Sequence, residues 1–240
     1  MNVNLSFDPT IPVADADGET DELIYRISHD LRASVRALQE LPTWIAEDLD
    51  ASNVSLPQPT GRHLELISSH AVRLDLMLTG LLEYSRIGRM QAIRAVKPAA
   101  IFADVVEDLG LPASVHLNAR IDTGSVQMGD ADVARIFSIL LTNCVRFHPE
   151  KTPRIDVVAG PFNDRDWVIE VSDNGPGISK ERRDFVLRPM TKLVSRDVDP
   201  GAGMGLAILR KIASIYGGSV TVCDTKSGKG IRVRVVLSVN

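Results

Sequence analysis

The sequence predicts an α+β protein in which an N-terminal helical hairpin precedes an α/β sandwich with one helical layer. Across residues 20–90, apolar side chains recur three and four positions apart, which is the spacing of amphipathic helices. From residue 91 onward, short runs of β-branched residues alternate with further helical segments. No internal repeat or low-complexity tract interrupts this order. The two patterns therefore divide the chain into two parts.

The composition is that of a folded protein with a mild acidic balance. The chain has 240 residues, of which 44% are hydrophobic, enough for one large domain or two modest ones. A formal net charge of -4 and the lack of a basic block argue against a nucleic-acid partner. Cys144 and Cys223 are far apart and lack ligand-like spacing, so we expect small core residues in a reducing compartment.

The first residues predict neither a signal peptide nor a membrane span. Residues 1–19 lack a basic start and an apolar core, and no later run approaches the roughly 18 apolar residues of a span. We therefore expect a cytoplasmic protein. The Pro, Gly and Asp content of residues 1–19 predicts a flexible leader that is too short to be a sensory domain.

The first helix of the hairpin is predicted to begin at Thr20, a suitable N-cap before two acidic residues. Pro42 lies inside this helix and removes one backbone donor, so we expect a kink or a local break near Leu41. The expected buried stripe consists of Ile24, Ile27, Leu31, Val35, Leu38, Ile45 and Leu49.

The second helix is predicted to begin near Thr60 and to end near Gly88, after a loop rich in helix breakers. A hairpin alone leaves half of each apolar stripe in water. A second copy that completes a four-helix bundle removes this cost, so we expect a homodimer. The second stripe consists of Leu64, Ile67, Ala71, Leu74, Leu78 and Leu81.

The remaining elements follow from periodicity and turn residues. Helices are expected at IFADVVEDL, DVARIFSILLTNCVRF and MGLAILRKIASIYGG. Antiparallel strands are expected at VHLNARID, SVQMG, RIDVVAG, WVIEVSD, SVTVCDT and IRVRVVLS. The last two strands are expected to form a hairpin across KSGKG.

Asp173 is the first candidate for ligand chemistry. It ends an expected strand in VSDNGPGIS, and Gly175 and Gly177 follow in a turn that only small residues allow. A buried carboxylate there can accept a hydrogen bond from the exocyclic amine of adenine. Taken alone, the stretch could equally be an ordinary β-turn.

The stretch GAGMGLAILRK, residues 201–211, is a glycine-rich loop that opens into a helix. Backbone N–H groups and the positive end of the helix dipole then face the contents of the loop, which favours phosphate. Alone this is weak evidence, because a flexible loop before a helix fits as well, and no strand precedes it as in a Rossmann turn.

An apolar helix carries Asn143 and, one turn later, Arg146 and Phe147. Asn143 can coordinate Mg²⁺ through its amide oxygen, and Arg146 can clamp phosphate oxygens. Either residue alone would fit the solvated edge of a helix. Three ligand-like stretches in this order are much harder to explain by coincidence.

Four stretches together resemble the core of sensor histidine kinases, from about Asp21 to the C-terminus. The stretch SHDLRASVRAL resembles the phosphoacceptor box, ILLTNCVRF the asparagine box, and DNGPG and GAGMGLAI the two glycine boxes that flank the ATP lid. The run KLVSRDVDPGAGMGLAILRKI is most like the phytochrome-type kinases. The resemblance implies a dimerisation and phosphotransfer hairpin at residues 20–90 and an ATP-binding domain of the Bergerat (GHKL) type at residues 91–240.

The resemblance also implies roles for individual residues, with ATP and Mg²⁺ as cofactors. His29 would be the phosphoacceptor, Asp30 the adjacent acid, Asn143 the Mg²⁺ ligand and Asp173 the adenine reader. Chemically, a neutral imidazole can attack the γ-phosphoryl group in line while Asp30 stabilises the cation, and the metal and Arg146 offset charge. The nucleotide pocket would be shaped by Phe147, Gly175, Gly177, Gly201, Gly203, Gly205 and Leu206.

We therefore expect an ATP-dependent protein-histidine kinase that autophosphorylates His29 and passes the phosphoryl group to a response-regulator receiver domain. The strongest alternative is a histidine phosphotransferase, a phosphorelay module whose nucleotide pocket is not functional; intact Asn143 and Asp173 favour the kinase. A protein-binding pseudokinase or anti-sigma-type switch would not need His29 and Asp30 together. A separate sensory or regulatory protein is a further possible partner, and transfer in cis or in trans both stay open.

Several positions depart from the pattern of the family. Ala33 stands where Thr or Asn orients water for dephosphorylation of the regulator, so we expect a poor phosphatase. Ile139 stands where related ATPases place a glutamate base, so steady ATP hydrolysis is not expected. Ile231 replaces a common small hydroxyl residue at the pocket edge. Residues 179–200 are expected to form a mobile lid, with Met190 packed beneath it.

Overall fold

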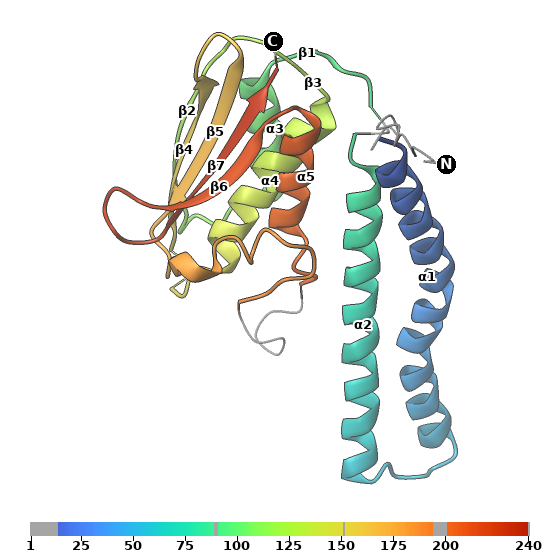
Figure 1. Cartoon of the computed structure of the whole chain (residues 1–240). Coiled ribbons are helices and arrows are strands. Elements are labelled where there is room, and N and C mark those ends of the chain that lie inside the picture. Colours follow the sequence, from blue (N-terminus) through green and yellow to red (C-terminus); the bar gives the residue numbers. More distant parts are fainter. Residues whose placement is uncertain (1–13, 89–90, 151, 194–200, 240) are drawn as a thin grey trace, which may run out of the picture.

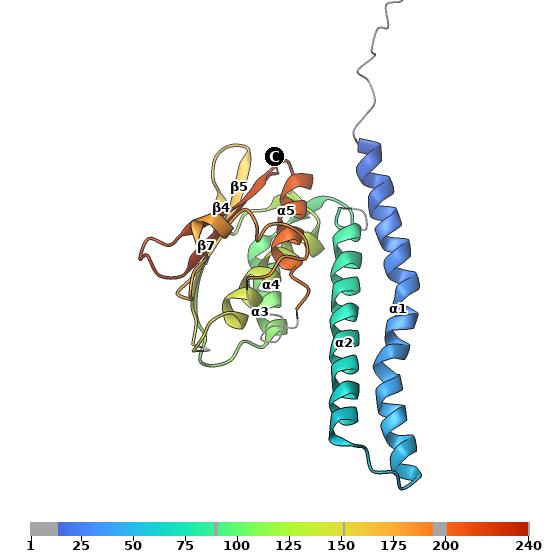
Figure 2. The same ribbon diagram turned by 60° about the horizontal axis from the view of Figure 1, so that its bottom comes forward.

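The computed structural model describes residues 14–88, 91–150, 152–193 and 201–239. Figure 1 shows a helical hairpin standing beside an α/β sandwich, which confirms the predicted α+β class. Figure 2 shows that α2 of the hairpin lies between α1 and the sandwich. Within the described ranges, no helix is long and apolar enough to cross a membrane.

The hairpin consists of α1, Ala14–Ala51, and α2, Gln58–Arg86. Helix α1 begins six residues before Thr20, so the predicted leader is wrong for residues 14–19, and residues 1–13 lie outside the described ranges. Pro42 lies inside α1 without interrupting it, so the break predicted near Leu41 does not form. Pro42 is buried, and packing of this kind can offset the loss of one backbone hydrogen bond.

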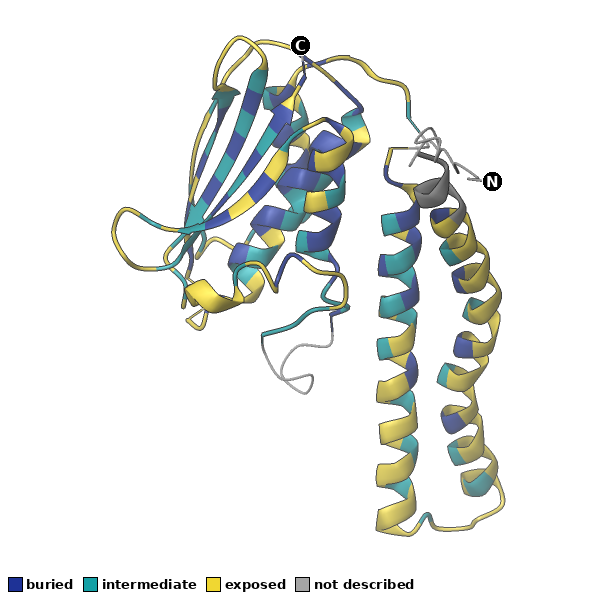
Figure 3. Cartoon of the chain, in the orientation of Figure 1, coloured by how far each residue is buried: buried dark blue, intermediate teal, exposed yellow. Residues whose placement is uncertain are grey.

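The hairpin buries only part of its apolar surface. In α1, the seven-residue spacing of Ser28, Val35 and Pro42 marks the buried face. Most of the other apolar positions are half-buried or exposed, and Figure 3 shows long exposed stretches on both helices. The single hairpin thus presents apolar surface of the kind that the predicted second copy would cover. The exposed members of the two predicted stripes are Ile27, Leu31, Leu38, Ile45, Ile67 and Leu74.

The sandwich is built on a five-stranded sheet in the order β2–β4–β5–β7–β6. Figures 1 and 2 show α3, α4 and α5 on one face of this sheet. The strands are β2 (His116–Ile121), β4 (Arg154–Pro161), β5 (Asp166–Asp173), β6 (Ser219–Asp224) and β7 (Ile231–Ser238). The helices are α3 (Pro98–Leu109), α4 (Asp130–Arg146) and α5 (Gly205–Ile215).

Two features of the strands were not predicted. Strand β2 pairs with β4 in parallel, whereas the other pairs in the sheet are antiparallel as expected. A short strand β1, Arg94–Val96, pairs with β3, Val126–Met128. The core lies between the sheet and the helices, as the dark blue layer of Figure 3 shows. Its fully buried side chains include Ile136, Phe137, Leu140, Ile169, Leu209 and Leu237.

Tyr216, the C-cap residue of α5, takes part in a buried polar network. Its hydroxyl donates to Oδ2 of Asp132 at 3.0 Å and accepts from the Gly129 N–H at 3.0 Å. Asp132 is fully buried, and burial raises the pKa of Tyr216 to about 12. The neutral hydroxyl therefore connects two buried polar groups.

We expect Tyr216→Phe to lower the free energy of unfolding by about 2 kcal/mol, because it leaves a buried donor and a buried carboxylate oxygen without this partner. Urea unfolding followed by circular dichroism measures the change. The control is Tyr25→Phe, at an exposed tyrosine of α1. Equal stability of the two variants would show that the network contributes nothing.

Candidate active site

One cavity of about 520 Å³ gathers the predicted ligand residues. It lies among α4, α5, the end of β5 and the adjoining loops, with α2 as a further wall. Their roles stay predictions, but the fold brings all ten together from distant parts of the sequence. They are Asn143, Arg146, Phe147, Asp173, Gly175, Gly177, Gly201, Gly203, Gly205 and Leu206.

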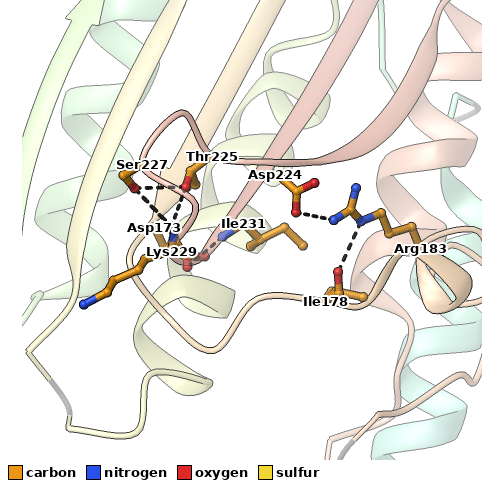
Figure 4. Close-up of polar contacts among 8 residues, drawn as sticks. All are labelled: Asp173, Ile178, Arg183, Asp224, Thr225, Ser227, Lys229 and Ile231. Carbon is orange, nitrogen blue, oxygen red and sulfur yellow. Dashed lines mark hydrogen bonds and ion pairs between the residues drawn. The ribbon is translucent and has the colours of Figure 1, made fainter.

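Asp173 is held at the end of β5 by backbone donors. Its Oδ1 accepts hydrogen bonds from the N–H groups of Gly175, at 2.7 Å, and Ile231, at 3.3 Å. Figure 4 shows the start of β7 at this carboxylate. The close approach of this segment to Asp173 requires glycine at position 230. Gly230 has a φ of 80°, and an added Cβ would lie 1.9 Å from the carbonyl oxygen of Asp173. The backbone N–H of Ile231 thus contributes to this edge of the cavity.

The asparagine and arginine of α4 meet the second glycine segment. The guanidinium of Arg146 lies 5.7 Å from the Phe147 ring centroid, and a Cβ on Gly201 would come within 2.3 Å of its Nη2. A Cβ on Gly205, at the start of α5, would lie 3.8 Å from Nδ2 of Asn143. A helix N-terminus, a guanidinium and an amide therefore surround one region, which suits phosphate with its counterion.

The residues present fit Mg²⁺ as a partner of phosphate. Among the described residues there is no group of three or more His, Cys, Asp or Glu side chains that could hold a metal by themselves. Mg²⁺ commonly binds through one or two protein oxygens together with substrate phosphates and water. The amide oxygen of Asn143 is suited to that role.

Gly203 gives the second glycine segment its shape. Its φ is 70°, and an added Cβ would lie 2.5 Å from the backbone oxygen of Thr191. We expect Gly203→Ala to weaken ATP binding at least tenfold, because the left-handed conformation and the backbone clash both displace the segment. Titration calorimetry measures the affinity. Gly61→Ala, on α2 where an added Cβ meets nothing within 4 Å, is the control.

The described start of the predicted lid is fastened to the sheet. Nε of Arg183 donates to the carbonyl oxygen of Ile178 at 3.2 Å, and its Nη2 pairs with Asp224 at the end of β6, as Figure 4 shows. The hydrogen bond from Arg183 lowers the pKa of Asp224. Residues 194–200, in the later part of the predicted lid, lie outside the described ranges.

The packing predicted for Met190 is wrong. Met190 is 42% exposed and has a φ of 59°. Val186 and Leu187 are buried instead, one turn earlier in the chain. The apolar contact beneath this segment is therefore made before the chain reaches Met190.

His29 lies on α1, outside the cavity. Its Nδ1 is 3.2 Å from Oδ1 of Asp30, and both side chains are exposed. The ring of Tyr25, one turn earlier, stacks at a centroid distance of 6.3 Å. When Nδ1 carries the proton toward Asp30, Nε2 keeps its lone pair for attack. No described residue of α1 lines the cavity, so this arrangement does not bring His29 to it.

The hairpin and the sandwich are joined by a partly buried ion pair. Nζ of Lys211 on α5 lies 2.6 Å from Oδ2 of Asp21 on α1, and 4.3 Å from the ring centroid of Tyr84 on α2. The side chains of the pair are only 14% and 12% exposed. On α2, Gly80 approaches so closely that an added Cβ would lie 2.7 Å from Cγ of Met204. Helix α2 therefore closes one side of the cavity.

Several cavity residues were missed from the sequence. Cys144 was expected only as a small core residue and His148 was given no role, yet both are buried and line the cavity. Nδ1 of His148 has no hydrogen-bond partner among the described residues. The position of both beside Asn143 and Phe147 was the available signal. The wall from α2 had no signal, because it depends on how the two parts dock; it consists of Leu76, Thr79, Gly80 and Glu83.

Comparison with known proteins shows which families the chain resembles. Residues 129–240 match the family described as "Histidine kinase-, DNA gyrase B-, and HSP90-like ATPase". Over 234 residues, the chain is 31% identical to the sensor protein KdpD of Rathayibacter rathayi, an alignment that covers 95% of this chain and 26% of KdpD. Over nearly its whole length, the chain matches the core of a sensor histidine kinase. This similarity supports a sensor kinase of two-component signalling, and the match to the ATPase family supports ATP binding.

Two further likenesses fit the kinase core. The chain is 33% identical over 106 residues to cyanobacterial phytochrome A of Nostoc sp. strain PCC 7120. This alignment covers 44% of this chain and 14% of the phytochrome. The full-length structure of ShkA in complex with AMPPNP shares the fold, with a TM-score of 0.64, 18% identity, and coverage of 91% of this chain and 46% of that one. The kinase core spans about a quarter of the length of KdpD.

Proposed function

We propose that this kinase core autophosphorylates His29 from ATP and passes the phosphoryl group to an aspartate on a response-regulator receiver domain. The observation that carries the proposal is the single cavity lined by all ten predicted nucleotide residues. The hairpin beside it carries an exposed imidazole next to a carboxylate. The alternative, a phosphorelay module, would have no functional nucleotide pocket.

The reaction assigns a task to each side chain. Nε2 of His29 forms a bond to the γ-phosphorus as the bond from that phosphorus to the bridging oxygen of ADP breaks. Asp30 accepts a hydrogen bond from the Nδ1 proton and stabilises the imidazolium that forms. Asn143 would hold Mg²⁺, which offsets the charge on the transferring group, and Arg146 would contact phosphate oxygens. Asp173 would accept a hydrogen bond from the adenine amine.

We infer that the kinase core acts as a homodimer. Exposed apolar side chains on both helices of the hairpin support this inference, because a second hairpin would bury them in a four-helix bundle. Light scattering of the purified protein tests it directly. A monomer at all accessible concentrations would contradict the inference.

The test of the proposed function is incubation with ATP that carries a labelled γ-phosphate, in the presence of Mg²⁺. We expect one label per active chain, stable in alkali and lost in acid, as for a phosphoramidate. Addition of a cognate receiver domain should then remove the label from the kinase. If ATP binds without labelling the protein, a passive relay or a binding switch replaces the kinase; if ATP does not bind at millimolar concentrations, the assignment of the cavity fails.

A further inference from the structure

A buried thiol lies beneath the candidate adenine edge of the cavity. Cys144 follows Asn143 on α4, and only 8% of it is exposed. Its Sγ lies 3.7 Å from Oδ2 of Asp173, within hydrogen-bond range for sulfur. Cys144 and Cys223 are both free, so neither is held in a disulfide. The proposed reaction gives Cys144 no task.

The thiol is placed to act as a hydrogen-bond donor. A thiol is a weak hydrogen-bond donor, and an ionised carboxylate can only accept hydrogen bonds. Oδ1 of Asp173 is already fixed by the backbone of Gly175 and Ile231. A donor at Oδ2 consequently fixes the second oxygen, and with it the plane of the carboxylate.

We propose that Cys144 is a positioning residue that orients Asp173 and so determines how strongly the cavity prefers an adenine base. This inference rests on the proposed function, because it assumes that ATP occupies the cavity. Each carboxylate oxygen can accept two hydrogen bonds. When Cys144 occupies one direction at Oδ2, the other is available to the exocyclic amine of adenine.

The thiol matters because the terminal torsion of aspartate is soft. Rotation about the last bond of Asp173 is only broadly restrained, so loss of one of its contacts spreads the carboxylate over several orientations. Fewer of these orientations present Oδ2 to the adenine amine. A purine without that amine gains nothing from the aligned carboxylate. Its affinity is therefore independent of Cys144.

The experiment compares two nucleotides on three proteins. Calorimetry gives the Kd of ATP and of purine riboside 5′-triphosphate, which lacks the exocyclic amine, for the wild type, Cys144→Ala and Cys223→Ala. We expect Cys144→Ala to weaken ATP binding about 3- to 10-fold, the range of one hydrogen bond, and to leave the analogue unchanged. Cys223→Ala, at a half-buried thiol on β6 outside the cavity, should change neither Kd.

The ratio of the two Kd values separates positioning from a structural role. An unchanged ratio in Cys144→Ala, including an equal loss for both nucleotides, overturns the inference. If the alanine variant does not fold, Cys144→Ser gives the same test. The C–O bond of serine is shorter than the C–S bond of cysteine and holds the donor farther from Oδ2. The Kd of the analogue divided by the Kd of ATP should therefore fall in the serine variant as well. Failure of the wild type to bind either nucleotide would instead contradict the proposed function.

Discussion

Replacement of His29 by glutamine is expected to reduce the acid-labile label by at least about 1,000-fold, because an amide nitrogen cannot act as the nucleophile. ATP affinity should stay at the wild-type value, since no described residue of α1 lines the cavity. Labelling with γ-labelled ATP and calorimetry on the same preparation measure the two quantities. Loss of labelling with intact binding would assign the chemical step to this one imidazole.

The matched control is His63→Gln, at an exposed histidine on α2. It should label at the wild-type rate. Persistent labelling of His29→Gln would mean that another side chain accepts the phosphoryl group. The assignment of His29 and Asp30 would then be abandoned, although the nucleotide site would stand.

Asp173→Asn is expected to weaken ATP binding about 30- to 100-fold. Hydrogen bonds to a charged group contribute more than neutral ones, and the substitution removes the charge. The amide can still accept from Gly175 and Ile231 through its oxygen, which turns its NH₂ group toward Cys144 and the cavity. There it would oppose the amine of adenine, donor against donor. Calorimetry with ATP gives the change in Kd.

Asp104→Asn, at an exposed aspartate on α3, carries the same loss of charge without a place in the cavity, and its ATP affinity should not change. The thermal midpoint of both variants shows whether the fold is kept. If Asp173→Asn bound ATP as tightly as the wild type, the adenine edge would lie elsewhere and the inference about Cys144 would fail with it.

Local patterns in the sequence were enough to predict the helices and most of the strands. Alternation in the segment that forms β5 and the three-four spacing in α4 each reflect burial on one face, which is a property of the segment itself. The glycine segments were predictable for a similar reason. Gly203 and Gly230 have positive φ and contact backbone, so no other residue fits.

What the sequence did not reveal depends on contacts between distant segments. The parallel pairing of β2 with β4 depends on the path of the chain across the sheet, and nothing within His116–Ile121 encodes its direction. The continuity of α1 through Pro42 reflects tertiary packing that overrides a local breaker. The same holds for the wall that Gly80 and its neighbours add to the cavity, because docking of two separately patterned units produced it.

The ion pair between Asp21 and Lys211 couples α1 to α5. Asp21 precedes His29 by about two helical turns, so a twist applied at the start of α1 acts on both residues together. Lys211 stands on α5, whose first residues line the nucleotide cavity. A rotation of α1 that turns the imidazole of His29 would therefore also be transmitted, through this pair, to a helix that lines the cavity. A change in the orientation of α1 at this end of the hairpin would thus alter the position of His29 and the wall of the cavity together.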